Sequence, residues 1–220
     1  MKLKAFAFCA ALSIFSIGCI KSTNSYVQPH KQPSYSASLE LEKPKDQVWK
    51  ELISSLGSHF FVINNLDKES GLINVSYSGD PEKYVDCGLI THDFENARGP
   101  RHYEFPGSRA NADYETTNSN NALTRVNRKL SLDGRINIIV ESLDTTHTKV
   151  MVNVKYVLTK SINGQALVVQ QNFSTNWVTM PPFVEVLSIN TNQDGKFPNS
   201  PTECRPTGAL EQEILALLKH

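Results

Sequence analysis

The sequence predicts an α+β fold in which a curved antiparallel sheet packs against a helix at the C-terminus. Apolar side chains alternate strictly over residues 149–160, which is typical of a strand with one buried face. Two segments, 43–57 and 206–220, instead carry apolar residues at helical spacing. Each helix needs an apolar face to bury and the strands offer one, so we expect a single domain over residues 38–220.

The first 18 residues are typical of a secretory signal. Two lysines precede an apolar run over 5–17, which is too short to span a bilayer as a helix, since that needs ~20 residues. The sequence SIGC, ending at Cys19, resembles the lipobox of bacterial lipoproteins, although leucine is commonest where Ser16 stands. The resemblance implies a signal peptide at 1–18 and acyl chains, palmitate among them, on Cys19. The alternatives are an ordinary cleaved signal and an uncleaved anchor.

Several acyl chains on one cysteine would hold the chain stably on a membrane. No aspartate follows Cys19, because the next residues are Ile20 and Lys21. In the lipoprotein family such an aspartate favours the inner membrane, so the resemblance implies the outer membrane, with the domain facing the periplasm. Residues 19–37 are polar, contain two prolines and lack an apolar period, and we expect a flexible tether there.

Charge and cysteine content narrow the function classes. Removal of the signal leaves 20 of the 22 basic residues against 22 acidic ones, so nothing favours a nucleic-acid partner. Cys87 and Cys204 remain in the mature body, and an exported protein is expected to pair them in a disulfide. In the chain-entropy model, closing this loop would stabilise the folded chain by about 4–5 kcal/mol. Neither cysteine has a CxxC partner or a histidine at ligand spacing, so we expect no metal and no cofactor.

The elements follow in order. We expect a short strand at 38–42, a helix over 43–57, strands at 59–65 and 71–79, and then a long loop insertion at 88–122 that is rich in Asn, Arg, Gly and Pro. Strands resume at 135–143 and 149–160, Asn163-Gly164 marks a hairpin turn, and residues 165–177 continue the meander. Thr207 can cap a closing helix of about 11 residues, whose apolar stripe is Leu210, Ile214, Leu217 and Leu218. This combination is called a helix-grip.

The segment VWKELISSLGSHFFVINNLDKESGLINVSY resembles the opening of the helix-grip domains of BamC-type outer-membrane lipoproteins, accessory subunits of barrel assembly. The matching features are Val48-Trp49, Leu52, Phe61, Ile63, Asp67, Gly71, Ile73, Val75 and Tyr77. The chain departs from that family in having room for one such domain instead of two, a short tether, the cysteine pair and the insertion. The resemblance implies a scaffold or assembly role and carries over no catalytic residue.

The insertion holds the one dense set of titratable side chains. An enzyme or metal site would have to be built from two histidines, His92 and His102, with nearby acids at Asp86, Asp93, Glu95 and Glu104. Their spacing matches no familiar motif, and we expect no enzyme. Tyr103, Phe105 and Tyr114 lie in polar sequence and are candidate contacts for a protein partner. Trp49 and Trp177 are expected in the core.

The sequence therefore predicts a non-catalytic lipoprotein, anchored through Cys19, that scaffolds or organises an assembly of envelope proteins through the insertion and a sheet edge. The alternative is a binding module with a cavity between sheet and closing helix for a lipid or other small apolar ligand. The large side chains on the closing helix favour a filled core. An enzyme would require His92 and His102 to converge.

Overall fold

The computed structural model describes residues 21–30, 34–59, 61–96, 98–170 and 174–219. The predicted signal peptide and the acylation site at Cys19 lie outside these ranges. Within them, no helix has the length and apolar character needed to cross a membrane.

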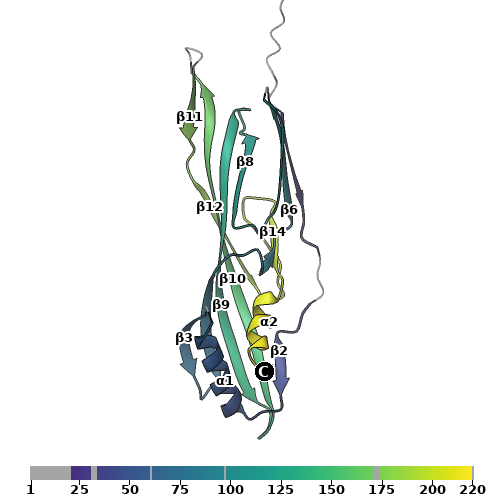
Figure 1. The fold of residues 1–220 in the computed structure, drawn as a ribbon, viewed down its shortest axis with the longest axis vertical. Coiled ribbons are helices and arrows are strands. Elements are labelled where there is room, and N and C mark those ends of the chain that lie inside the picture. The colour runs from purple at the N-terminus through teal and green to yellow at the C-terminus, as the bar shows by residue number, and fades with distance from the viewer. Residues whose placement is uncertain (1–20, 31–33, 60, 97, 171–173, 220) are drawn as a thin grey trace, which may run out of the picture.

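Two long strands, β9 (Leu123–Ser142) and β10 (Thr148–Val169), pair antiparallel along almost their whole length and set the long axis of the molecule (Figure 1). They form the centre of an eight-stranded sheet. Its other members are β2 (Ser38–Leu41), β3 (Val62–Asp67), β4 (Leu72–Gly79), β8 (Asn111–Thr117), β11 (Thr175–Thr179) and β12 (Phe183–Asn190). Both β11 and β12 pair with β10, one after the other, while β4 and β8 pair with opposite ends of β9.

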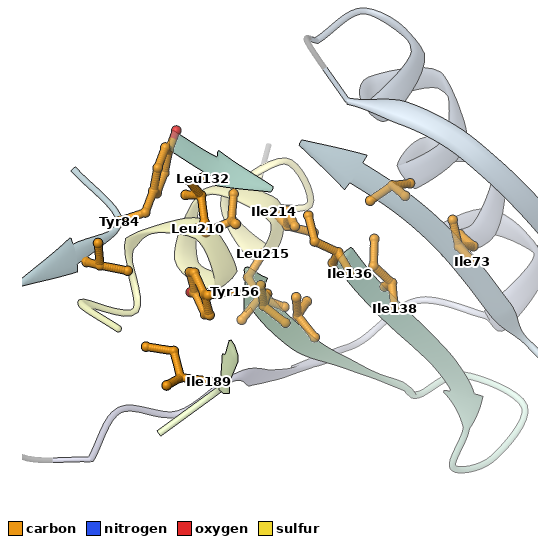
Figure 2. Packing of buried hydrophobic residues seen from close by; sticks show 14 of the residues in the cluster. Ile73, Tyr84, Leu132, Ile136, Ile138, Tyr156, Ile189, Leu210, Ile214 and Leu215 are labelled. Atoms are coloured by element: carbon orange, nitrogen blue, oxygen red, sulfur yellow. The ribbon is translucent and has the colours of Figure 1, made fainter. Parts of the chain in front are cut away.

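The helices cover one end of this sheet. Helix α1 (Lys45–Gly57) contacts β9 and β3, and α2 (Ala209–Ala216) contacts β10. Figure 2 shows the core between them, where Ile136 and Tyr156 of the long strands lie beside α2 and Ile138 lies nearer Ile73 of β4. Most of the apolar stripe predicted for each helix is buried, at Val48, Trp49, Leu52, Leu56, Leu210, Ile214 and Leu218. Ile53 and Leu217 are only partly buried, and Leu215, which was not predicted, is buried as well. Helix α2 is shorter than expected, with eight residues, and begins after Gly208, whose φ is +81°.

The fold is mostly β, with antiparallel sheets, two short helices and a C-terminal helix against β10. It contains three sheets, where one was expected. The second sheet joins β1 (Lys21–Val27), β6 (Leu89–Asn96) and β7 (Gly99–Pro106) in the order β1-β6-β7. The third joins β13 (Gly195–Lys196), β14 (Glu203–Pro206) and β5 (Val85–Asp86).

The prediction of a loop at 88–122 is wrong, because three strands, β6 to β8, occupy most of it. The inward positions of these strands alternate as strands require, but aromatic and polar side chains fill them, so the segment looked like loop. The tether prediction is wrong for Lys21–Val27, which pairs with β6 from end to end. Ladder hydrogen bonds stabilise this polar strand without an apolar face.

The predicted turn at Asn163-Gly164 is also wrong. Both residues lie within β10, opposite Asn127 and Val126 of β9, and the chain reverses later, where the Gln170 N–H donates to the Ser174 carbonyl (2.8 Å). Pairing along the whole of β9 overrides the local turn preference. Trp177, expected in the core, is partly exposed on β11.

Candidate functional site

The end of the molecule opposite the helices is a two-layer structure. The β1-β6-β7 sheet faces β8 and the far halves of β9 and β10 (Figure 1). Between the layers the rings of His92 and Tyr114 stack with centroids 4.0 Å apart, and Phe105 lies 5.7 Å from Tyr114. Phe105 is 4% exposed, so the expectation of an exposed contact residue is wrong for this side chain.

A charged groove of about 700 Å³ opens beside this interior. The carboxylate of Glu115 on β8 forms ion pairs with Arg101 of β7 and Arg125 of β9, and it accepts a hydrogen bond from the Tyr103 hydroxyl. The Arg125 guanidinium also lies 4.3 Å from the ring centroid of Trp177. Tyr103 and Tyr114 both line this groove, and Tyr114 also packs between the layers against His92.

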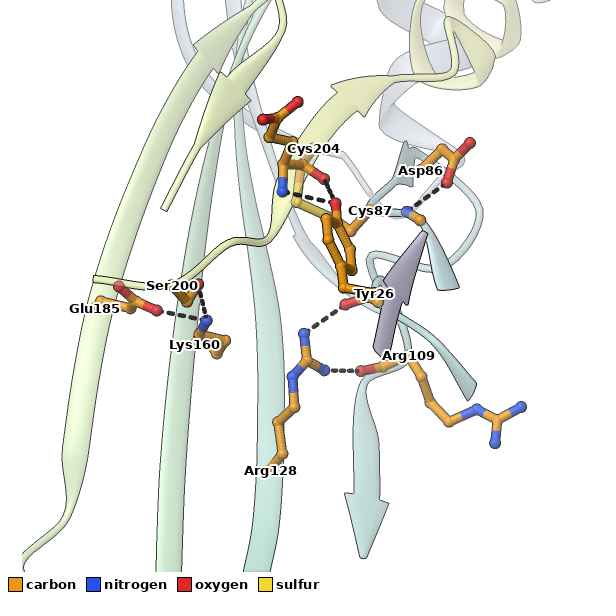
Figure 3. The surroundings of a disulfide bond; sticks show 12 residues. Tyr26, Asp86, Cys87, Arg109, Arg128, Lys160, Glu185, Ser200 and Cys204 are labelled. Atoms are coloured by element: carbon orange, nitrogen blue, oxygen red, sulfur yellow. Dashed lines mark hydrogen bonds and ion pairs between the residues drawn. A yellow bond between two sulfur atoms is a disulfide. The ribbon is translucent and has the colours of Figure 1, made fainter. Parts of the chain in front are cut away.

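A second group of polar side chains is buried on β10 and β12. Lys160 and Glu185 form an ion pair (Nζ–Oε1, 2.5 Å) with side chains only 3% and 2% exposed, and the Lys160 ammonium also donates to Ser200 Oγ (2.7 Å; Figure 3). The Asn199 N–H donates to the other carboxylate oxygen. Burial raises the pKa of Glu185, but these hydrogen bonds outweigh it and leave the pKa below its ordinary value.

Arg128 of β9 lies close to this pair and is 2% exposed. Its guanidinium donates to the carbonyls of Gly107 (2.5 Å) and Arg109 (3.1 Å), which fixes the link between β7 and β8 (Figure 3). Among the described residues no carboxylate forms an ion pair with it. Burial lowers the pKa of this guanidinium, because the charged form has lost its hydration.

The predicted disulfide is confirmed, with Cys87 and Cys204 bonded (S–S 2.06 Å) and fully buried. It ties the residue that follows β5 to β14 across 117 positions of sequence. The Tyr26 hydroxyl of β1 reinforces this join, since it donates to the Glu203 carbonyl (3.0 Å) and accepts from the Glu203 N–H (2.8 Å). The disulfide is consistent with an extracytoplasmic protein.

The two histidines of the enzyme hypothesis do not converge. His92 points into the interior, where its Nδ1 donates to Asn24 Oδ1 (2.6 Å), and burial lowers its pKa to about 4. The next residue, Asp93, points to the opposite face and meets His102 (2.7 Å), whose pKa it raises. Asp86 accepts a hydrogen bond from the Gly88 N–H instead of joining either histidine. No group of three potential metal ligands occurs in the described part of the chain.

One outer edge of the large sheet is apolar and exposed. We call it the apolar edge; it consists of Trp177, Val178, Phe183, Val184 and Val186 on β11 and β12, each at least 37% exposed. Side chains on both faces of β11 contribute, because Trp177 and Val178 alternate. In the described residues β11 pairs with β10 alone, so its outer backbone groups have no strand beside them. Such an edge is a template for another strand.

Sequence reasoning missed the buried cations, although the sequence contains a signal for them. Residues at even positions of β10 from Val150 to Leu158 are apolar and inward, and Lys160 continues this series. A lysine at an inward position predicts a buried partner or a ligand. Arg128 occupies the corresponding face of β9. It lies between the loop expected to end at residue 122 and the strand expected to begin at residue 135, in a segment for which the sequence pattern predicts no strand.

Comparison with known proteins gives no relative for this chain. No family model matches it, and neither a curated protein nor a solved structure resembles it significantly. The functional argument therefore depends on the residues themselves.

Proposed function

We propose that this chain is a non-catalytic lipoprotein of the outer membrane, acylated at Cys19 and facing the periplasm, that organises an assembly of envelope proteins. The observation that carries the proposal is the apolar edge. An exposed strand edge with apolar side chains on both faces suits an extended segment of another protein, which would pair with the backbone of β11 and cover its side chains.

The position of the edge fits a membrane-anchored protein. Figure 1 shows β11 at the same end of the molecule as the start of β1, where Lys21 follows the predicted acylation site by two residues. An envelope protein bound at the edge would therefore lie close to the anchor. The groove with Tyr103 and Tyr114 lies on the same half of the molecule and adds polar contacts.

The closing helix packs against the sheet as in a helix-grip, and an assembly role is what the likeness of residues 48–77 to BamC-type domains would imply. The alternative, an apolar cavity between sheet and helix, has less support, because Leu210, Ile214 and Leu215 fill that space with fully buried side chains. The scaffold function is therefore the one we adopt.

A photo-crosslinking amino acid at Val184, introduced into the full chain in its native envelope, tests the proposal. We expect one adduct with an envelope protein, identified by mass spectrometry, and its loss when Val186→Glu places a charge in the edge. The same probe at the exposed Glu141, at the helix-covered end, should give no such adduct. Labelling with palmitate, in parallel with Cys19→Ser, tests the anchor. Equal adducts at both probe positions would contradict the proposal.

A further inference from the structure

A cavity of about 280 Å³ lies inside the two-layer end of the molecule and is separate from the apolar edge. Its walls come from β1, β6, β7, β8, β9, β10 and the segment before β14. Taking ~30 Å³ as the share of one water in the liquid, the volume corresponds to roughly nine such molecules. A small organic molecule of similar size would fill it.

The cavity is lined by two buried cations. Ile162 of β10 pairs with Arg128 and Lys160 pairs with Leu130, so the two charged side chains are diagonal neighbours on one face of the sheet. Burial lowers the pKa of Lys160, and the nearby charge of Arg128 lowers it further. The two positive charges are thus close enough to repel each other.

One carboxylate compensates these two charges. Glu185 pairs with Lys160, while Arg128 has carbonyl partners and no ion-pair partner in the described chain. His92, which also lines the cavity, is neutral at pH 7, since its pKa is about 4. The interior therefore holds an excess positive charge, and a buried charge without a counter-ion is costly.

The rest of the lining combines apolar side chains with the polar side chains of Asn24, Ser25, Tyr26, Ser200 and Thr202. Ile90, Phe105, Ile162 and Pro201 form walls that suit a hydrocarbon group, and the ring of Tyr114 lies beside them. Pockets of this kind combine an apolar body with a few polar groups that fix the orientation of the ligand.

From this arrangement we infer that the cavity binds a small amphipathic anion, whose carboxylate meets Arg128 and Lys160 and whose short hydrocarbon chain lies against the apolar walls. The carboxylate supplies the missing counter-charge through charge-assisted hydrogen bonds. This function is additional to the scaffold role, and it does not depend on the anchor or on the apolar edge.

Isothermal titration calorimetry with three probes tests the inference on the full chain carrying Cys19→Ser, so that no membrane competes for the ligand. Hexanoate has both the charge and the chain, 1-hexanol has the chain alone, and acetate has the charge alone. We expect hexanoate to bind with a Kd of about 1 mM or below, and the other two at least about tenfold more weakly.

Variants locate the site. Arg128→Met should weaken hexanoate binding about tenfold or more, since it removes a charged hydrogen-bond donor. Arg109→Met is the matched control, because this arginine belongs to the neighbouring turn but its side chain is exposed, and binding should not change. Ile162→Trp fills the cavity while keeping the charges and the carbonyl contacts of Arg128, so it decides the matter if Arg128→Met does not fold.

Two results would overturn the inference. One is that the folded chain shows no hexanoate binding up to about 10 mM, well above the expected Kd. The other is that Ile162→Trp binds hexanoate as well as the parent does. In either case Arg128 would serve only to hold the link between β7 and β8. Neither result would bear on the crosslinks expected at the apolar edge.

Discussion

The two ends of the long sheet bury polar groups in opposite ways. At the helix-covered end, Glu211 of α2 is fully buried and accepts hydrogen bonds from three hydroxyls, those of Tyr35, Tyr156 and Thr191. At the other end, Arg128 and Lys160 are buried beside a cavity, and the one carboxylate of the described residues that forms an ion pair there, that of Glu185, contacts Lys160. The first arrangement is closed and stabilises a core, whereas the second is open to a ligand. A buried charge therefore indicates a ligand site here only where a cavity lies beside it.

The pKa values of the tyrosines around Glu211 agree with this closed arrangement. Burial and the nearby carboxylate raise the pKa of both Tyr35 and Tyr156, so these hydroxyls stay protonated and remain donors. Nothing in this cluster is left for a ligand to supply.

The largest effect should come from breaking the buried ion pair at the open end. Lys160→Met leaves Glu185 buried without its cation, and we expect a loss of about 3–5 kcal/mol in the free energy of unfolding. The double variant Lys160→Met/Glu185→Leu should recover most of that loss, because no charge remains buried. Urea denaturation of the parent and both variants measures this. A double variant as unstable as the single one would show that the pair itself holds the end together.

The core at the closed end should respond to lost volume. Leu52→Ala on α1 removes a fully buried side chain, and we expect a loss of about 2–5 kcal/mol from transfer and cavity terms together. Leu66→Ala, an exposed leucine of β3, is the control and should change stability by less than about 0.5 kcal/mol. Thermal and urea unfolding provide the comparison. Equal losses would mean that the helices do not cover the principal core.

Acidification should lower the free energy of unfolding through His92, at the end of the molecule opposite the helices, by less than the two changes above. Burial lowers the pKa of His92 from its ordinary value of 6.5 to about 4 in the folded chain, because burial disfavours the charged imidazole. The unfolded chain thus binds more protons between these values, so stability is present above pH 6.5 and is lost as the pH falls toward 4. We expect this residue to contribute about 2 kcal/mol of that loss, allowing for its partial burial.

Denaturation of His92→Gln at several pH values between 4 and 7 checks this contribution, since the variant should lose less stability than the parent on acidification. His102→Gln is the control, because that histidine is exposed and its pKa is raised by Asp93. If His92→Gln follows the parent curve throughout, burial of this imidazole does not govern the acid sensitivity.

The smallest effect on folding should come from the apolar edge. Val186→Ser changes an exposed side chain, and we expect stability to change by less than about 0.5 kcal/mol. The proposed partner should nevertheless bind more weakly, by analogy with the truncation of an interface residue. Co-purification from solubilised envelopes, together with unfolding of the isolated chain, separates the two effects. A variant that unfolds more easily and still retains its partner would place the edge in the fold and not in the interface.

Prediction from the sequence worked where side-chain periodicity is strong. The helix stripe around Leu52, the alternation from Val150 to Leu158 and the Cys87–Cys204 pair were all foreseen, because local pattern and compartment chemistry determine them. The strands of the insertion were not foreseen, since His92, Tyr103 and other aromatic or polar residues fill the inward positions. Their placement depends on contacts between distant segments.

The candidate site could be predicted only in part for the same reason. Tyr103 and Tyr114 do line a common groove, but Phe105, on the same face of β7 as Tyr103, packs against Tyr114 between the layers and is buried. The buried pair of Lys160 and Glu185 requires β10 and β12 to be side by side, which follows from a reversal near residue 170 that the Asn163-Gly164 motif concealed. The prediction failed here because it placed the hairpin at the wrong position, more than because it misjudged the residue types.

The start of β1 at Lys21 would fix the orientation of the protein on a bilayer if Cys19 carries acyl chains, as we propose. Lys21 would then lie within ~7 Å of the attachment point, because two residues span no more than this. Strand β10, with 22 residues, extends roughly 70 Å away from that end. The helices would thus be displayed at a fixed height above the lipid surface, where they could meet molecules that never approach the membrane.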